Sequence, residues 1–600
     1  MPIPKRSEVP VRETWDLSLI YPTEEAFDAD EKETRERVDR IEKTYKGKLD
    51  TAEAIVNCLD EAEQIYIKMD HLGTYTGLAL EVDYTNHENE ARSNRIDNQL
   101  TAYRSRLSFI ESEIAAADEA VLEEAIGLAK GSKNYLKDVL RYRPHRLGAE
   151  TEKVLSAFGQ TFGTPYSVYV SAKLADMKFD DFTVAGKTYP LGYSLFEDNY
   201  EFEADTEVRR AAFRAFYAKL KEYENVTATA YNSAVTQEKV EATLRGFDSV
   251  FDYLLFDQKV TREMYDRQID LITEKLAPAM RKYAKLIRRI YKLDKMTFAD
   301  LKLPVDPDYD PRITIDESKK MLVDGLAILG PDYQNMVAEA FDKRWIDFAK
   351  NEGKCTGGFC SSPYGKNSFI LLSWNDRMSD VSTLAHELGH AGHFKACNAA
   401  QSNYDTDVST YFVEAPSTMN ELLFSDALLK DATDKRFRRY VLAGLIGNTY
   451  YHNFVTHLRE AWYQREVYKI IDEGGSVNAE ILSDIFRKNL ELFWGDAAEI
   501  SDGAELTWMR QPHYYMGLYS YTYSAGLTVA TEAARRIREE GAPAVEDWKK
   551  VLKAGSTLDP AGLAKLAGID ITTDAPLLRT IDYISGIIDE IVALTDELEG

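Results

Sequence analysis

The segment HELGHAGH, residues 386–393, constrains the fold of this chain more than any other feature of its sequence. His386 and His390 are four residues apart. On an α-helix this spacing places them about 40° apart around the axis and about 6 Å apart along it. Both imidazoles then project from one face, where they can bind one metal ion together. The segment therefore predicts a helix with a metal site on one face.

Glu387 completes the pattern H-E-x-x-H and predicts what such a site does. A zinc ion lowers the pKa of a bound water to near neutrality, and a neighbouring carboxylate can take the proton. The competing interpretation is a solvated helix face with incidental histidines. Chance predicts at most about 0.02 such pentads in a chain of this composition. We therefore favour the metal site.

A catalytic zinc needs a third protein ligand. His393 is the nearest candidate, but its Cα lies about 4.5 Å beyond that of His390 along the helix, and three ligands on one straight helix would strain a tetrahedral site. The segment YFVEAPSTMNELL (411–423) offers Glu414 instead. Glu421, seven residues later, can hold a ligand histidine in the right tautomer. Taken alone, Glu414 is better explained as a surface carboxylate.

The segment HYYMGLYSYTYSAGL (513–527) combines His513 with five tyrosines: Tyr514, Tyr515, Tyr519, Tyr521 and Tyr523. Peptide hydrolysis passes through a tetrahedral oxyanion, and hydroxyl and imidazole N–H donors stabilise such a charge. The alternative is that these rings only pack, since the chain has 36 tyrosines. Gly517 and Gly526 indicate a loop that flexes against a substrate.

The remaining pattern predicts a mainly α fold. Apolar residues recur at three- and four-residue steps along most of the chain, which is typical of amphipathic helices. Residues 177–191 predict a hairpin, and NSFILLSW (367–374) a short strand before the motif helix, with Ser379 or Asp380 as its N-cap. Residues 301–316 predict a loop. A chain of 600 residues is longer than one hydrophobic core can support, so we expect two lobes, at residues 1–200 and 201–600.

Charge and composition exclude several partners. The net charge of −27 argues against nucleic acid or an anionic membrane as the main partner, because both need a basic face. No apolar run is long enough to span a bilayer, and the N-terminus has no signal-peptide pattern. The four cysteines are few and irregularly spaced, which favours free thiols in a reducing compartment. We expect a cytoplasmic protein.

Taken together, these motifs resemble the thimet-oligopeptidase-type zinc peptidases. HELGH is followed by FVEAPSTMNELL and preceded by NSFILLSWNDRMSDVSTLA. The segment WIDFAKNEGKCTGGFCSSPYG (345–365) and the tyrosine-rich segment add to the likeness. The opening ETWDLSLIYPTEEAF narrows it to the oligoendopeptidase F branch. The resemblance extends over residues 10–585.

The resemblance implies an elongated, two-lobed helical zincin-type peptidase with a deep substrate channel and a small β-sheet beside the active site. Its N-terminal lobe forms part of the channel wall, and one zinc ion lies on the channel floor. The metal ligands are His386, His390 and Glu414, with His393 as second choice. Glu387 is the general base and then acid, and Glu421 supports a ligand. His513, Tyr519 and Tyr521 are the expected transition-state donors, and the strand at 367–374 pairs with the substrate backbone.

The sequence thus predicts a zinc endopeptidase that cleaves short unstructured peptides. A dipeptidyl carboxypeptidase on the same fold, a non-catalytic peptide-binding protein and a metal-dependent structural scaffold are the alternatives. Intact Glu387 argues against a pure binding protein, which has no use for a general base there. Cleavage preference, physiological substrate, oligomeric state and channel closure are left open by the sequence.

Overall fold

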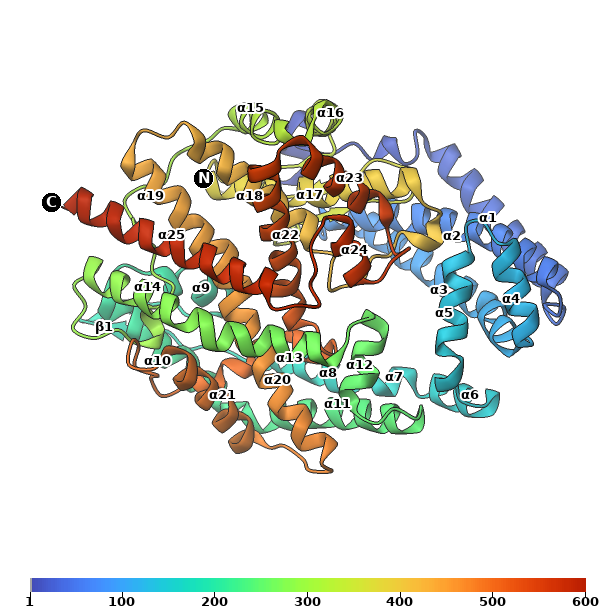
Figure 1. Ribbon diagram of the computed structural model, residues 1–600, viewed down its shortest axis with the longest axis horizontal. Coiled ribbons are helices and arrows are strands. Elements are labelled where there is room, and N and C mark those ends of the chain that lie inside the picture. The colour runs from blue at the N-terminus through green and yellow to red at the C-terminus, as the bar shows by residue number, and fades with distance from the viewer. Residues whose placement is uncertain (1–2, 600) are drawn as a thin grey trace.

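The computed structural model of the chain describes residues 3–599 and is mainly helical, as predicted (Figure 1). Residues 1, 2 and 600, the outermost positions of the two expected lobes, lie outside the described residues. The first half of the chain forms α1 (Glu24–Tyr45), α2 (Ala52–Glu81), α3 (His87–Ala116), α4 (Glu119–Leu128), α5 (Lys133–Tyr142), α6 (Ala149–Ala157), α7 (Gly159–Phe162), α8 (Thr164–Val170), α9 (Tyr193–Asp198), α10 (Thr206–Glu222), α11 (Glu224–Leu244), α12 (Val250–Gln258), α13 (Arg262–Leu271) and α14 (Ala277–Ile290). The second half forms α15 (Ile315–Gly325), α16 (Pro331–Asp342), α17 (Met378–Ala400), α18 (Ala415–Lys430), α19 (Lys435–Gly444), α20 (His457–Asp472), α21 (Ala479–Trp494), α22 (Ser520–Glu540), α23 (Ala542–Ala554), α24 (Pro560–Leu566) and α25 (Ala575–Glu599).

Two hydrophobic cores organise these helices. The first lies among α1–α5, at the right of Figure 1, and its buried residues run from Trp15 to Leu136, with Phe369 and Leu371 added from the second half of the chain. The second and larger core takes its buried residues from Met177 to Leu594. The expected division into lobes at residue 200 stays a prediction. Among the described residues, no helix has a stretch that is long and apolar enough to cross a membrane.

A three-stranded sheet joins the two cores. Its order is β3 (Ile346–Asp347), β5 (Phe369–Leu371) and β4 (Phe359–Ser361). β5 is parallel to β3 and antiparallel to β4. Successive side chains of a strand point to opposite faces. Phe369 and Leu371 accordingly pack into the first core, and Ile370 and Leu372 into the second. The unbroken apolar run of the sequence follows from burial on both faces.

The position of β5 overturns one prediction. The strand at 367–374 exists, but β3 and β4 occupy both of its hydrogen-bonding edges. It is therefore not available to pair with a substrate. β3 and β4 are both outer strands, but residues 13–16 bond to the backbone on either side of β3, through Asp16 to Arg344 and from Phe348 to Glu13. Among the described residues, this leaves the far edge of β4 for an added strand.

Of two other local predictions, the hairpin is confirmed and the N-cap of the motif helix is wrong. The hairpin is confirmed as β1 (Phe182–Val184) paired antiparallel with β2 (Lys187–Tyr189). The N-cap prediction is wrong, because α17 begins at Met378 and Arg377 is the residue before it. Asp380 lies inside the first turn, where its carboxylate accepts hydrogen bonds from the backbone N–H groups of Asn375 and Arg377. A carboxylate in the first turn is favourable because free N–H groups point toward it.

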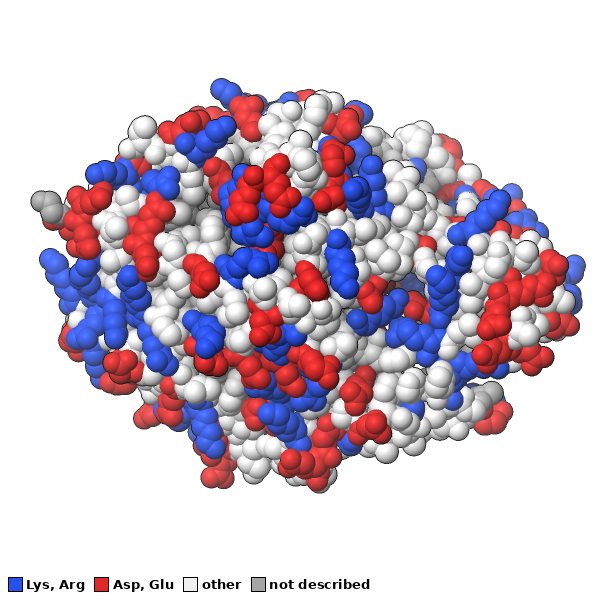
Figure 2. All heavy atoms as spheres, in the orientation of Figure 1, with Lys and Arg blue, Asp and Glu red and all other residues white. Residues whose placement is uncertain are grey.

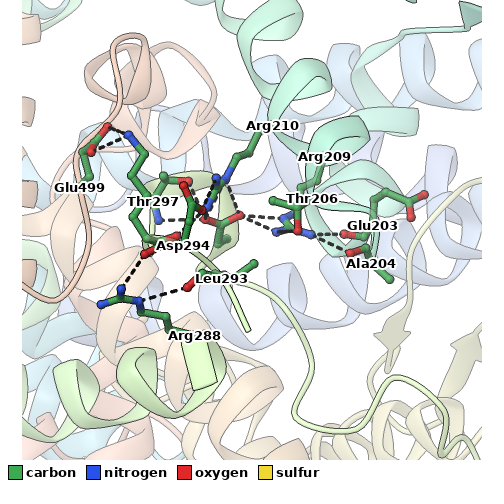
Figure 3. A network of polar contacts seen from close by, with 12 residues as sticks. Glu203, Ala204, Thr206, Arg209, Arg210, Arg288, Leu293, Asp294, Thr297 and Glu499 are labelled. Carbon is green, nitrogen blue, oxygen red and sulfur yellow. Dashed lines mark hydrogen bonds and ion pairs between the residues drawn. The ribbon is translucent and has the colours of Figure 1, made fainter. Parts of the chain in front are cut away.

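The loop predicted at 301–316 is confirmed up to the start of α15, and a buried carboxylate fixes its beginning (Figure 3). Asp300 has no exposed surface and forms ion pairs with Arg209 at 2.6 Å and Arg210 at 2.8 Å. Thr297 donates to it from both its backbone N–H and its hydroxyl. A buried charge is tolerated when it is paired in this way. Asp300 therefore anchors the loop to α10.

The face shown in Figure 2 carries interspersed acidic and basic side chains. It is hollowed between α5 on one side and α12 and α24 on the other.

Candidate metal centre

Two helices bring three ligand side chains together. α17 carries His386 and His390 on one face, and Glu414 lies directly before α18. One carboxylate oxygen of Glu414, Oε2, is 3.4 Å from Nε2 of His386 and 3.4 Å from Nε2 of His390. Bonds of about 2.0–2.1 Å around a tetrahedral zinc separate neighbouring ligand atoms by about 3.3 Å. Both distances from Glu414 match that separation, so the three side chains are placed to share one ion of this kind.

Further polar contacts orient these ligands. His386 donates from Nδ1 to Glu421 at 2.7 Å, which leaves the Nε2 lone pair free for a metal. The hydroxyl of Thr449 donates to the other oxygen of Glu421. Ser417 donates to Glu414 Oε2 at 2.8 Å. Glu421 thus contacts Nδ1 of His386, and its role as support for a ligand histidine stays a prediction.

The charges of the centre attract one another strongly. Burial lowers the pKa of His386, but Glu414 and Glu421 together raise it well above its usual value. Burial raises the pKa of Glu414, but the two histidines lower it well below its usual value. The Glu414 carboxylate therefore remains ionised and presents negative charge to a cation.

Two glycines set the distance between the helices. A Cβ on Gly389, within the motif, would lie 2.5 Å from the carbonyl oxygen of Pro416 and 2.5 Å from Cα of Ser417. A Cβ on Gly526 would lie 3.3 Å from Cβ of Glu414. Gly526 lies inside α22 and packs against Glu414, so its assignment to a flexible loop is wrong. Gly517 does lie outside the helix, with a φ of +63°.

Glu387 lies beside the metal ligands in a nearly closed environment. It is 6% exposed, and burial is the main cause that raises its pKa above the usual value. A Cβ on Gly358 would be 3.5 Å from Glu387 Oε1. Because β4 begins at the next residue, the free-edged strand runs alongside this carboxylate.

His393 lies apart from the three ligands. It is 1% exposed and stacks on Phe394 with ring centroids 5.2 Å apart. Burial lowers its pKa to about 3, so the ring is neutral. Its nitrogens are not among the ligand atoms that gather at His386, His390 and Glu414.

The tyrosine-rich segment contributes a group of rings beside the centre. His513 lies 5.5 Å from Tyr519 between ring centroids, and its Nε2 is 3.5 Å from the hydroxyl of Tyr523. Burial raises the pKa values of Tyr519 and Tyr523, and the charge of Glu414 adds to both increases. These hydroxyls therefore stay protonated near the metal centre.

Tyr521 does not join this group, contrary to the prediction. It has no exposed surface, and its hydroxyl donates to Gln258 in the core. α22 begins at Ser520, so Tyr519 and Tyr523, four residues apart, share one face and Tyr521 points to another. Tyr523 is one of the five tyrosines of the segment but was not among the expected donors, although its four-residue spacing from Tyr519 was the signal that could have selected it.

Comparison with known proteins identifies the family. The family model described as peptidase family M3 matches residues 200–583, and a model described as Oligopeptidase F matches residues 113–179. The chain belongs to peptidase family M3. Oligopeptidase PepF of Bacillus subtilis is 28% identical over 99% of this chain and 88% of its own length. An oligoendopeptidase F homolog of Lactococcus lactis is 25% identical over 99% of each chain.

The fold of this M3 peptidase is also that of solved relatives. The crystal structure of oligoendopeptidase-F from Enterococcus faecium superimposes with a TM-score of 0.73 at 22% identity, covering 96% of this chain and 99% of that one. The resemblance to oligoendopeptidase F is thereby confirmed. The M3 family is one of metallopeptidases, which implies a bound metal. His386, His390 and Glu414 form a possible site for it.

Proposed function

We propose that this M3 peptidase is a zinc-dependent endopeptidase that cleaves internal bonds of short, unstructured oligopeptides. The observation that carries the proposal is the placement of Glu414 at 3.4 Å from both motif histidines, with Glu387 beside them. Two imidazole nitrogens and one carboxylate oxygen suit zinc and leave a fourth position open. We expect one zinc ion per chain, held by His386, His390 and Glu414.

Zinc bound there would supply a Lewis acid that makes a water nucleophilic at neutral pH. Glu387 takes the proton of that water. Its raised pKa makes it a stronger base than an exposed glutamate and lets it keep the proton until the leaving amine accepts it. Glu387 is thus general base first and general acid afterwards.

His513, Tyr519 and Tyr523 supply hydrogen bonds to the oxyanion that forms at the attacked carbonyl. Both tyrosines have raised pKa values, so each hydroxyl keeps the proton that it must donate. Donors that are already positioned stabilise the developing charge without reorganising. Tyr523 takes the place that the sequence analysis assigned to Tyr521.

An extended peptide is the substrate that suits this centre. The free edge of β4 passes Glu387 and can add one more strand through backbone hydrogen bonds. Only a segment without secondary structure of its own presents its backbone in this way. We propose that the hollow of Figure 2 belongs to the substrate channel between lobes 1–200 and 201–600. All four cysteines are free thiols, which favours a reducing, cytoplasmic location.

An internally quenched peptide tests the proposal with the protein as isolated, after chelation and after zinc is restored. Internal cleavage that is lost on chelation and returns with zinc is the expected result. Mass spectra of products from peptides of graded length separate endopeptidase action from cleavage at a fixed distance from the C-terminus, which would indicate a dipeptidyl carboxypeptidase. Tight zinc binding without cleavage would instead show a peptide-binding protein or a structural scaffold.

A further inference from the structure

A second cluster of titratable side chains lies against Tyr523. We call it the histidine cluster, and it consists of His452, His457, Glu460 and His513. The ring of His457 stacks on that of Tyr523, with centroids 4.0 Å apart and an interplanar angle of 13°. The cluster therefore includes the proposed imidazole donor, His513, and packs against the ring of the proposed hydroxyl donor, Tyr523.

An unusual helix builds the cluster. α19 and α20 are joined by the π-helix η11 (Leu445–Thr456). Residues five apart on an α-helix lie about 140° apart around the axis, whereas i→i+5 hydrogen bonding brings them to one face. His452 and His457 accordingly meet, with 3.0 Å between their Nε2 atoms. π-helical turns occur frequently at functional sites.

Glu460 is the centre of the cluster. It is 1% exposed, and its Oε2 accepts hydrogen bonds from His457 Nδ1 at 2.8 Å and from the hydroxyl of Ser520 at 3.1 Å. The same oxygen is 3.6 Å from His513 Nδ1. Burial raises the pKa of Glu460, but His457 and His513 outweigh burial and lower it to about 2. The carboxylate is therefore ionised at neutral pH.

The distances within the histidine cluster favour hydrogen bonds rather than a second metal ion. The ligand atoms of the metal centre are 3.4 Å apart, close to the edge of about 3.3 Å that a zinc tetrahedron requires. The 2.8 Å between His457 and Glu460 is shorter than such an edge and is an ordinary charge-assisted hydrogen bond.

Two buried atoms of the cluster remain without a partner. Among the described residues, neither His513 Nδ1 nor Glu460 Oε1 has a hydrogen-bond partner. One belongs to an imidazole and the other to a carboxylate, and the two side chains already lie at ion-pair distance. An unsatisfied buried polar group costs about 1–3 kcal/mol, so pairing them stabilises both.

We propose that Glu460 is a positioning residue for His513: it holds the Nδ1 proton, so that a doubly protonated ring presents its Nε2–H toward Tyr523 and the substrate. A neutral ring protonated at Nδ1 has only an acceptor at Nε2 and cannot donate to an oxyanion. The negative charge of Glu460 favours the form with two N–H donors. This inference rests on the proposed function, in which His513 is a donor.

Glu460→Gln in the zinc-loaded, full-length protein tests the proposal. The change keeps the shape of the side chain and removes its charge. We expect kcat to fall about 10- to 100-fold, as for other residues that orient a functional histidine, with KM changed by less than about threefold. The pH profile of kcat should also change, because the carboxylate charge that lies 3.6 Å from His513 Nδ1 is then absent.

The other charged and titratable groups around the cluster are the same in the native protein and in Glu460→Gln, so they cannot by themselves cause a difference between the two pH profiles. They are His452, His457, Tyr514, Tyr519, Tyr523 and Lys302. Glu238→Gln is the matched control. Glu238 is a half-buried carboxylate that pairs with the hydroxyl of Tyr468. This control should keep the native kcat and pH profile.

Nitrogen-15 NMR of His513 separates this inference from the proposed function. Two protonated ring nitrogens in the native protein, and one in Glu460→Gln, would support the positioning role even if no peptidase activity were found. An unchanged pH profile and an unchanged His513 spectrum would overturn it. So would a second metal ion per chain that is lost in Glu460→Gln. If that variant does not fold, Glu460→Asp keeps the charge and should retain the native pH profile at lower kcat.

Discussion

Replacing Gly389 by Ala tests whether helix spacing sets the metal centre. The added Cβ would lie 2.5 Å from the carbonyl oxygen of Pro416, whereas ordinary contacts begin at 3.4 Å. α17 and α18 must therefore separate by about 1 Å. The histidines move with α17 and Glu414 with α18, so the ligand distances of 3.4 Å widen to about 4.4 Å, beyond the span of a tetrahedral zinc.

A misplacement of about 1 Å in a catalytic centre costs about 100-fold in rate, or about 2.7 kcal/mol. We expect at least this loss in kcat/KM on the quenched peptide, and weaker zinc retention on dialysis against a chelator. Gly77→Ala is the matched control, because a Cβ on Gly77 meets no atom within 4 Å. If Gly389→Ala keeps its zinc and a kcat/KM within about threefold of native, the spacing argument is refuted.

Four further outcomes are expected. Glu387→Gln should keep zinc and peptide affinity but lose nearly all turnover; preserved turnover would remove Glu387 as the base. Glu414→Ala should lose zinc, whereas His393→Ala should keep it, as measured by metal analysis. The reverse result would make His393, not Glu414, the third metal ligand. Tyr523→Phe should lower kcat about 10- to 1,000-fold, whereas Tyr521→Phe should act mainly on thermal stability. Burial raises the pKa of Glu238 from 4.5 to about 7, so the stabilisation from its bound proton is complete below pH 4.5 and lost as pH rises through about 7. Over that window Glu238→Gln should gain stability relative to the native chain, by about 3 kcal/mol at most, and thermal unfolding at several pH values measures the difference.

Local periodicity explains what could be predicted. The four-residue spacing of His386 and His390 specifies one helix face whatever surrounds it, and α17 covers the motif. The alternating run at 182–189 and the apolar run before the motif specify strands for the same reason. The M3 family followed from short motifs of this kind.

Tertiary packing decided the rest. β5 has the composition of a strand, but only its neighbours show that it is central and that β4 is the free edge. Tyr519, Tyr521 and Tyr523 are alike in sequence, and the start of α22 determines which two face the metal centre. The sequence suggested that Gly526 is a flexible loop residue, and only the structure shows that it packs against the backbone of Glu414.

The sequence by itself determined the placement of the proposed ligand pair and base, because His386, Glu387 and His390 follow one another along one turn of a helix. It did not determine what reaches them from elsewhere. Glu414 lies directly before α18, Glu421 lies within it, and Glu460 lies 53 residues before His513 in the chain. Contacts between distant segments depend on how closely helices approach and how they are rotated. In this chain those are set by the glycines between α17, α18 and α22 and by the π-helix before α20.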